Sequence, residues 1–373
     1  MPSLEIVASA ESLRFNDSET WVSFGAQWNS GEQKTLECCA IHDETPDVRT
    51  FVFRCQDFTA LAFEPGQFIT ISPQIVGQTV SRCYTVSSAP TRPFTFSITV
   101  KRVPGGTVSN WLHDNMKVGV QLSAAGPAGA FTPIGHPCRK LLYLSAGSGV
   151  TPLMSMARAG FDLRADLDTA FVHSARTPTD IVFRCELVQL EAMQKKFKVF
   201  AVCEGYGSEP DWDGPIGRLD LSLLQSLVPD FLEREVFTCG PKGYMDAVQR
   251  VLQEGGFDLK HYHQESFDIA ALDPEVEVEV PAVNSCDVFT ITLAKSGMVF
   301  TMNSAQTVLS AAKMAGAVVP SSCSQGICGT CKTAVLEGTV EMKHKGGIRQ
   351  REINQGLRLL CCSKPTSDLV IDL

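Results

Sequence analysis

Residues 320–335 read PSSCSQGICGTCKTAV and carry Cys323, Cys328 and Cys331 with the spacing C-x4-C-x2-C. A fourth thiol follows after 29 intervening residues, where LLCCSKPTSDLVIDL (359–373) holds two adjacent cysteines. Small residues between the first three cysteines let the backbone approach closely, so that amides can point at sulfur atoms. Four thiolates that converge on one small volume form the ligand set of a metal centre.

The spacing of these thiols predicts a plant-type [2Fe–2S] cluster held by Cys323, Cys328, Cys331 and Cys361. Zinc is the alternative, but structural zinc sites favour two C-x2-C pairs. Adjacent side chains of an extended chain point to opposite faces, so only one of Cys361 and Cys362 is a ligand. We choose Cys361, because its distance to the sequence PTSD resembles the end of plant ferredoxins. Residues 285–373 therefore resemble a plant-type ferredoxin domain, which implies an α+β (β-grasp) fold.

The composition of the whole chain bounds the remaining possibilities. It has 373 residues, of which 44% are hydrophobic and 20% charged, so we expect two or three globular domains and no disordered polar chain. No apolar stretch reaches the ~20 residues of a membrane helix. The acidic N-terminus lacks the features of a secretory signal, so we expect a cytoplasmic protein. The net charge of −9 argues against nucleic acid as a partner.

Shifts in composition divide the chain into five segments. Residues 1–34 form an acidic extension for which the sequence offers no interpretation. Residues 35–135 contain short β-branched and aromatic runs bounded by Pro and Gly, which predict an antiparallel β-barrel. Residues 136–268 alternate apolar strands with helices, which predicts an α/β domain with a parallel sheet. Residues 269–284 form an acidic linker, and residues 285–373 form the ferredoxin-like domain.

A flavin site is predicted where the barrel reads RCYTVSS (82–88). Arg82 offers charged donors for a phosphate, and Tyr84 offers a flat face for an isoalloxazine ring. Thr85 supplies a small hydroxyl that can hydrogen-bond flavin N5. The pattern R-x-Y-[ST]-x-x-S resembles the flavin fingerprint of the ferredoxin–NADP reductase superfamily. A strand with an exposed Arg and a packed Tyr is the alternative.

The segment KRVPGGTVS (101–109) resembles the phosphate loop of that superfamily, followed by a helix expected to begin near Asn110. Glycines allow close approach of the backbone, and a helix N-terminus favours anions. Loops of this kind hold a diphosphate, so the resemblance implies FAD, with FMN as the alternative. The flavin-binding residues expected in the barrel are Arg82, Tyr84, Thr85, Val86, Ser87, Thr99, Lys101, Gly106, Val108 and Ser109.

A second nucleotide site is predicted in LLYLSAGSGVTPLMSMA (141–157), where a strand runs into a Gly-rich turn and a helix. The segment VFTCGPKGYM (236–245), placed at the end of a fifth strand, resembles the superfamily's CGP motif, whose thiol lies beside the nicotinamide. The resemblance implies a catalytic role for Cys239 together with Tyr84 and Thr85. The other residues expected to bind the nucleotide are Gly147, Gly149, Thr151, Pro152, Ser174, Arg176, Gly240 and Pro241, and Phe267 is expected to stack on the flavin.

The choice between NADH and NADPH depends on HSARTPTD (173–180). Arg176 could hold the 2′-phosphate of NADPH, as an arginine does in other enzymes. The surrounding segment AFVHSARTPTDIVFRCEL (170–187) instead resembles NADH-linked flavin–ferredoxin reductases, in which Asp180 opens a helix. We therefore expect NADH.

The order of the three domains predicts an electron-transfer enzyme. It would oxidise NADH and pass single electrons from FAD through the cluster to a partner. Four segments resemble the reductase component of bacterial Rieske monooxygenases that demethylate glycine betaine and related quaternary amines, which implies a Rieske-type oxygenase as partner. They are RVPGGTVSNWLHDN (102–115), FVHSARTPTDIVFR (171–184), PDFLEREVFTCGP (229–241) and YHQESF (262–267). The alternatives are a reductase for a hybrid-cluster protein or an aromatic-ring oxygenase and, from another class, a redox-sensing binding module.

Overall fold

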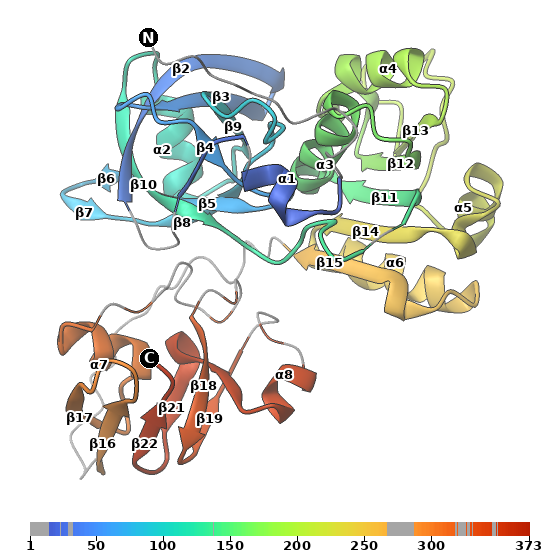
Figure 1. The fold of residues 1–373 in the computed structure, drawn as a ribbon. Coiled ribbons are helices and arrows are strands. Elements are labelled where there is room, and N and C mark those ends of the chain that lie inside the picture. Colours follow the sequence, from blue (N-terminus) through green and yellow to red (C-terminus); the bar gives the residue numbers. More distant parts are fainter. Residues whose placement is uncertain are drawn as a thin grey trace.

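The computed structural model describes residues 15–22, 24–28, 33–136, 138–266, 287–317, 319, 326, 329, 331–344, 348 and 350–373. Its main elements form three sheets that follow one another along the chain (Figure 1). Within the described ranges, no helix has the length and apolar character needed to cross a membrane. The acidic linker, Phe267, Cys323 and Cys328 lie outside the described residues.

The first sheet is antiparallel, with six strands in the order β8-β5-β10-β2-β3-β9. Its strands are β2 (Gln33–Thr45), β3 (Val48–Cys55), β5 (Phe68–Ser72), β8 (Arg82–Thr85), β9 (Phe96–Lys101) and β10 (Gln121–Ala128). A bridge between Val86 and Ile98 joins the two edges, so the sheet closes on itself as the expected barrel. The short strands β6 (Gln74–Ile75) and β7 (Gln78–Thr79) form a separate pair.

One helix fills the barrel. It is α2 (Thr107–Asn115), which packs Val108 and Leu112 into the core beside Phe51. The sequence led us to expect the helix to begin near Asn110, but it begins three residues earlier, at Thr107. The reason is that Gly106, in an extended conformation, already serves as its N-cap residue.

The extension before the barrel is part of the folded molecule, although its sequence had no interpretation. Helix α1 (Ser18–Val22) places Trp21, which is 1% exposed, in the core of the second domain, where its ring meets Phe15 edge-on. Trp28 packs into the barrel core instead. Between them, β1 (Ala26–Gln27) pairs in parallel with β4 (Leu61–Ala62). The extension therefore contributes to both cores.

The second sheet is parallel, in the order β13-β12-β11-β14-β15. Its strands are β11 (Lys140–Ala146), β12 (Asp168–Ala175), β13 (Phe197–Cys203), β14 (Glu235–Gly240) and β15 (Tyr262–Ser266). The helices are α3 (Val150–Asp162), α4 (Arg184–Met193), α5 (Leu221–Leu227) and α6 (Lys242–Glu254). Because side chains alternate along a strand, both faces of β11 carry apolar groups that the helices cover.

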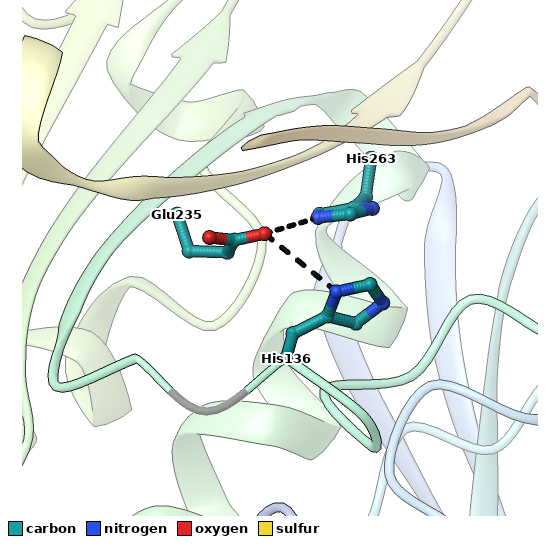
Figure 2. A group of neighbouring side chains, drawn as sticks. All are labelled: His136, Glu235 and His263. Carbon is teal, nitrogen blue, oxygen red and sulfur yellow. Dashed lines mark hydrogen bonds and ion pairs between the residues drawn. The ribbon is translucent and has the colours of Figure 1, made fainter. Parts of the chain in front are cut away.

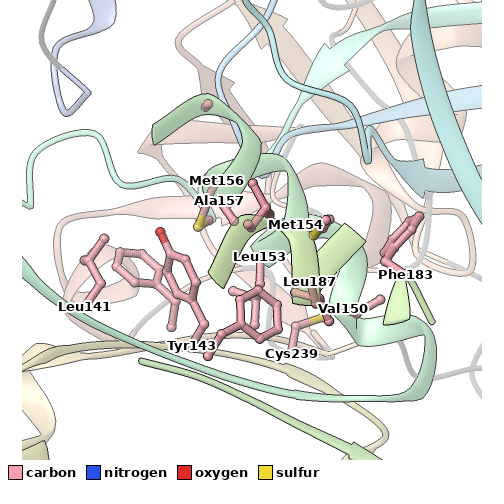
Figure 3. Close-up of a cluster of buried hydrophobic side chains, with 14 of the residues drawn as sticks. Leu141, Tyr143, Val150, Leu153, Met154, Met156, Ala157, Phe183, Leu187 and Cys239 are labelled. Carbon is pink, nitrogen blue, oxygen red and sulfur yellow. The ribbon is translucent and has the colours of Figure 1, made fainter. Parts of the chain in front are cut away.

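The two faces of this sheet form separate cores. Leu141 and Tyr143 of β11 pack with Met154 and Met156 of α3 on one face, so both methionines lie in the core (Figure 3). Leu142 and Leu144 belong to the other core, which α5 and α6 cover. This layering leaves the carboxyl ends of β11, β12 and β14 on one edge, where their connections to the helices begin.

Two details expected for this domain are wrong. Cys239 lies on β14, the fourth strand in chain order, and the fifth is β15, whose polar sequence YHQES gave no strand signal. Asp180 does not open a long helix. It ends a 3-10 turn over Pro178–Asp180, and α4 begins only at Arg184. Phe183 separates the two, because its φ of 60° is left-handed and cannot continue a right-handed helix.

The third sheet is mixed, in the order β17-β16-β22-β18-β20. Helix α7 (Val308–Met314) packs against it and shares its hydrophobic core. Thr307 caps α7 by accepting a hydrogen bond from the Ser310 N–H at 3.3 Å. The strands of this sheet are β16 (Val288–Leu293), β17 (Val299–Asn303), β18 (Lys332–Glu337), β20 (Leu357–Leu359) and β22 (Leu369–Ile371). The strands β19 (Val340–Met342) and β21 (Ser363–Pro365) form a separate pair, and helix α8 (Gln350–Asn354) precedes β20. The helix on a mixed sheet agrees with the expected α+β domain.

Candidate functional site

The strand that carries the flavin motif, β8, pairs antiparallel with β5, which places Tyr84 opposite Ile69. Tyr84 is half-buried against the barrel core, and burial raises its pKa above the ordinary value. The next side chain, Thr85, is buried, and its hydroxyl finds no hydrogen-bond partner among the described residues. An orphaned buried hydroxyl is unfavourable unless a ligand satisfies it. An unsatisfied hydroxyl on this strand fits a polar edge of a flavin.

Two residues expected to bind the flavin have their hydroxyls engaged within the barrel. Ser87 Oγ lies 2.9 Å from Thr99 Oγ1 and 2.9 Å from Ser97 Oγ, and Thr99 also bonds to Thr50. These bonds hold both side chains within the barrel. Val86 is buried in the strand contact that closes the barrel. The structure therefore gives these three residues a role in shaping the strand.

The expected phosphate loop turns at Gly105, whose φ is +75°. Gly106 follows at the start of α2, and a Cβ there would lie 2.6 Å from Ser109 Oγ. That hydroxyl accepts a hydrogen bond from the Val103 N–H at 3.3 Å, so it closes the loop. No described side chain caps the first turn of α2, which leaves its N–H groups for an anion. Val108 points into the core instead.

A cavity of about 420 Å³ lies at the carboxyl edge of the parallel sheet. Its walls include the turn after β11 at Gly147, the end of β12 at Ser174, and Pro241 and Tyr244 after β14. The Ser174 and Tyr244 hydroxyls are buried there near each other, and neither has a hydrogen-bond partner of ordinary geometry in the described part of the chain. This cavity lies where open α/β sheets bind nucleotides, and its unsatisfied polar atoms fit such a ligand.

The Gly-rich turn packs directly against the CGP segment. A Cβ on Gly149 would lie 2.3 Å from the Cys239 carbonyl oxygen and 2.6 Å from the Gly240 Cα, so only glycine fits. The first turn of the following helix, α3, contains Thr151 and Pro152, and the Thr151 hydroxyl donates to the Ser148 carbonyl at 3.1 Å. The two sequence motifs expected to bind the nucleotide thus form one surface.

Cys239 and Glu265 lie opposite each other on neighbouring strands. Cys239 is fully buried, and burial, followed by the nearby Glu265 charge, raises the pKa of its thiol well above the usual value. Burial also raises the pKa of Glu265 to about 8, and its Oε2 atom has no partner among the described residues. Burial therefore favours the neutral form of both groups. Sequence reasoning missed Glu265, because the register between β14 and β15 is not visible in the sequence.

Helix α3 ties the nucleotide turn to the flavin strand. Ser155 donates to the Ser88 carbonyl at 2.7 Å, and Arg158 donates to the Ser87 carbonyl at 2.5 Å. A bidentate ion pair with Glu186 fixes the Arg158 guanidinium. The sequence carried no signal for these contacts, which place the two nucleotide sites next to each other.

Arg176, the residue considered for a 2′-phosphate, is already paired with two carboxylates. Its guanidinium lies 2.8 Å from Asp180 and 3.3 Å from Asp47, and Asp47 also pairs with Lys101 at 3.3 Å. Asp47 belongs to the barrel and Arg176 to the parallel sheet. These charges line the mouth of the nucleotide cavity.

The described part of the cysteine site brings Cys331 and Cys361 together. The Cys361 N–H donates to Cys331 Sγ at 3.4 Å, and the Gly326 N–H donates to Cys361 Sγ at 3.1 Å. The Cys362 thiol instead donates to the Leu359 carbonyl at 3.6 Å. Gly326 must remain a glycine, because a Cβ there would lie 2.8 Å from Cys362 Sγ. A thiol that accepts a backbone N–H bond beside a second thiol fits a cluster ligand.

Comparisons with known proteins agree with this arrangement. Residues 36–132 match the oxidoreductase FAD-binding domain, residues 143–250 the oxidoreductase NAD-binding domain, and residues 291–366 the 2Fe-2S iron-sulfur cluster binding domain. The glycine betaine monooxygenase reductase subunit of Chromohalobacter salexigens is 45% identical over 92% of this chain and 96% of its own. The stachydrine N-demethylase reductase subunit of Rhizobium meliloti is 39% identical over 91% and 95%. The crystal structure of phthalate dioxygenase reductase covers 91% of this chain and 98% of its own, with a TM-score of 0.55 and 25% identity.

A flavin barrel, a pyridine-nucleotide sheet and a [2Fe–2S] domain in one chain define an electron-transferring oxidoreductase, and the expected FAD, NAD and [2Fe–2S] domains are confirmed. The chain belongs to the family of glycine betaine monooxygenase reductase subunits. Such a reductase component delivers its electrons to an oxygenase.

Replacing Glu265 with Gln should change how stability depends on pH. The folded-state pKa of Glu265, about 8, lies above its ordinary 4.5, so the folded protein keeps a proton that the unfolded chain releases. The free energy of unfolding of the wild type should therefore fall as pH rises from about 4.5 to 8, by a few kcal/mol relative to Glu265→Gln. Urea unfolding of both proteins between pH 5 and about 9 measures this difference. Parallel curves would show that the carboxyl is not shielded.

Proposed function

We propose that this chain passes electrons from NADH through FAD and the [2Fe–2S] cluster to a Rieske-type oxygenase that demethylates glycine betaine or a related quaternary amine in the cytoplasm. The observation that carries the proposal is the 45% identity to a glycine betaine monooxygenase reductase subunit along nearly the whole chain. The direct contact between the Gly149 turn and Cys239, with α3 bonded to the flavin strand, supports it.

The groups that the chain binds supply the redox chemistry: the nicotinamide carries a hydride, and the flavin and cluster relay single electrons. The chain contributes position and charge. Burial raises the pKa values of the Cys239 thiol and the Glu265 carboxyl, which favours their neutral forms and so limits the fixed charge beside the proposed transfer path. Thr85 offers its unsatisfied hydroxyl on the flavin side. The bonds from Ser155 and Arg158 of α3 hold these two surfaces together and thereby favour a short transfer path.

The residue assignments of this proposal follow the motifs. Cys239, Tyr84 and Thr85 form the catalytic contacts, with the flavin and nucleotide residues named above around them. Cys323, Cys328, Cys331 and Cys361 hold the cluster. The division at residues 34, 135, 268 and 284 belongs to the proposal as well, and the matched family domains lie within those bounds.

The pairing of Arg176 leads us to propose NADH as the donor. Asp47 and Asp180 occupy its guanidinium and would repel a 2′-phosphate. We expect kcat/KM for NADH to exceed that for NADPH by at least about 10-fold. Asp47→Asn combined with Asp180→Asn should lower KM for NADPH and leave that for NADH nearly unchanged. Steady-state reduction of ferricyanide measures both values, and an unaltered NADPH KM would contradict this role of the two carboxylates.

Reconstitution with an oxygenase tests the proposed function. Purified holoprotein, NADH and a purified glycine betaine monooxygenase oxygenase component should form formaldehyde from glycine betaine, with NADH consumed in proportion. An oxygenase for aromatic rings serves as the comparison partner. Turnover with the aromatic-ring oxygenase alone would favour the alternative reading, and NADH oxidation by ferricyanide without transfer to either oxygenase would refute the proposed partner class.

A further inference from the structure

A second cluster of titratable side chains lies outside the nucleotide and cysteine sites. Glu235 contacts three histidines, of which His261 and His263 are neighbours in the chain and His136 comes from a distant segment (Figure 2 shows His136 and His263). Its Oε1 atom lies 2.5 Å from His263 Nε2 and 3.6 Å from His136 Nδ1. Its Oε2 atom lies 2.9 Å from His261 Nδ1. The nearest ligand atoms of His136, Glu235 and His263 all lie within 4.8 Å of one another.

The cluster is distant in the fold from the hydride-transfer surface. Glu235 begins β14, whereas Cys239 lies four residues further along the same strand, toward the nucleotide cavity. His263 comes from β15, the neighbouring edge strand. His136 comes from the connection between β10 of the barrel and β11 of the parallel sheet. A ligand held here would therefore join the interdomain connection to the edge of the second sheet.

The surroundings hold the three groups in place. The ring of Phe237 lies 4.8 Å from the His263 ring and 6.0 Å from the His136 ring, measured between centroids, and forms an apolar floor. The Glu235 and His263 side chains are each 9% exposed, and His136 is 30% exposed. The site is thus closed on the sheet side and open to solvent on the His136 side, as an ion entering from water requires.

We propose that His136, Glu235 and His263 bind a divalent cation of the zinc class. Two imidazole nitrogens and one carboxylate oxygen suit Zn²⁺ and neighbouring transition metals, and Mg²⁺ and Ca²⁺ prefer oxygen ligands alone. Ligands about 2.1 Å from a tetrahedral zinc stand about 3.4 Å apart. The Glu235–His136 separation of 3.6 Å already fits, the Glu235–His263 separation of 2.5 Å must open, and the two histidine nitrogens, which lie within 4.8 Å of each other, must close by up to about 1.4 Å. Water would complete the coordination.

His261 has a different part in this site. Its Nδ1 contacts Oε2, the carboxylate oxygen that faces away from His136 and His263. A hydrogen bond to the second oxygen of a ligating carboxylate orients the first one. We therefore assign His261 as a positioning residue, and the ion as a structural link between the interdomain connection and the sheet.

Elemental analysis of the holoprotein tests this site with Zn²⁺ as the probe. After incubation with a small excess of ZnCl₂ and removal of unbound metal, the wild type should retain one zinc for every two irons of its cluster. The variant His136→Asn, His263→Asn should retain none, with unchanged iron and flavin. His42→Asn, an exposed histidine on β2, is the matched control and should behave like the wild type. Zinc should also raise the Tm of the wild type by a few °C and leave that of the double variant unchanged.

Two outcomes would overturn the proposal. One is a wild type that retains no zinc, and the other is equal retention by the double variant, which would place the metal on other ligands such as thiols. Should the double variant lose iron or flavin through misfolding, His136→Asn alone decides, because that partly exposed loop residue can change without disturbing the sheet. Zinc retention by this single variant at the wild-type level would equally refute the site.

Discussion

Cys361→Ser is expected to lower the rate of electron delivery to a one-electron protein acceptor such as cytochrome c by at least about 100-fold. NADH-dependent reduction of ferricyanide should continue. Cys361 is buried beside Cys331, and its Sγ accepts the Gly326 N–H at 3.1 Å. Serine oxygen is a poor ligand for iron–sulfur clusters, so the cluster should be lost. The nucleotide and flavin surfaces belong to other sheets and should keep their activity.

Cys362→Ser is the matched control, because the two cysteines are adjacent and the substitution is the same. Cys362 donates to the Leu359 carbonyl at 3.6 Å, and a serine can keep that bond. This variant should retain wild-type iron content and cytochrome c reduction. If Cys362→Ser loses iron and Cys361→Ser keeps it, the ligand assignment is reversed. If Cys361→Ser also loses ferricyanide reduction, the two redox modules are not separable.

Where a local pattern determines the structure, the sequence predicted it well. The runs VRTFVFRC (48–55) and DTAFVHSA (168–175) form β3 and β12 inside the segments expected to fold as a β-barrel and a parallel sheet, because β-branched and aromatic residues favour a pleated, buried strand. The Gly-rich turn after β11 also lies where expected, since glycines mark positions that tolerate close approach. These signals depend on residues that are near one another in the chain.

Features that depend on tertiary register were missed. Glu265 faces Cys239 only because β15 pairs with β14 in one register, and the polar strand YHQES has no alternating pattern. Trp21 packs into a core built mostly from residues more than 100 positions later in the chain. The hydrogen bonds from Ser155 and Arg158 to the Ser88 and Ser87 carbonyls also join residues that are far apart in the sequence. The Glu235 cluster joins three segments in the same way. No local sequence pattern encodes contacts between distant residues. The sequence alone therefore indicates which residue types are present but does not show which of them come together in the fold.

Gly149→Ala should lower the rate of flavin reduction by NADH by about 100-fold, because the hydride donor and acceptor must keep their separation to within about 1 Å. The backbone of Gly149, with φ −64° and ψ −5°, suits any residue, so the change adds only a methyl group. That methyl would lie 2.3 Å from the Cys239 carbonyl oxygen and 2.5 Å from its carbon. Both are backbone atoms of a central strand, so the turn must move away from Cys239 and open the surface that we propose for the nicotinamide.

The same substitution elsewhere separates this steric effect from a general loss of glycine. Gly205, after β13, has no atom within 4 Å of an added Cβ, so Gly205→Ala should reduce flavin at the wild-type rate. Stopped-flow absorbance at the flavin band gives both rates, and flavin content confirms that each barrel is intact. A wild-type rate for Gly149→Ala would mean that β14 can shift to accept the added methyl group without slowing flavin reduction. It would also mean that contact between the turn and Cys239 does not set the transfer geometry, in which case Thr85 and Glu265 would have to set it.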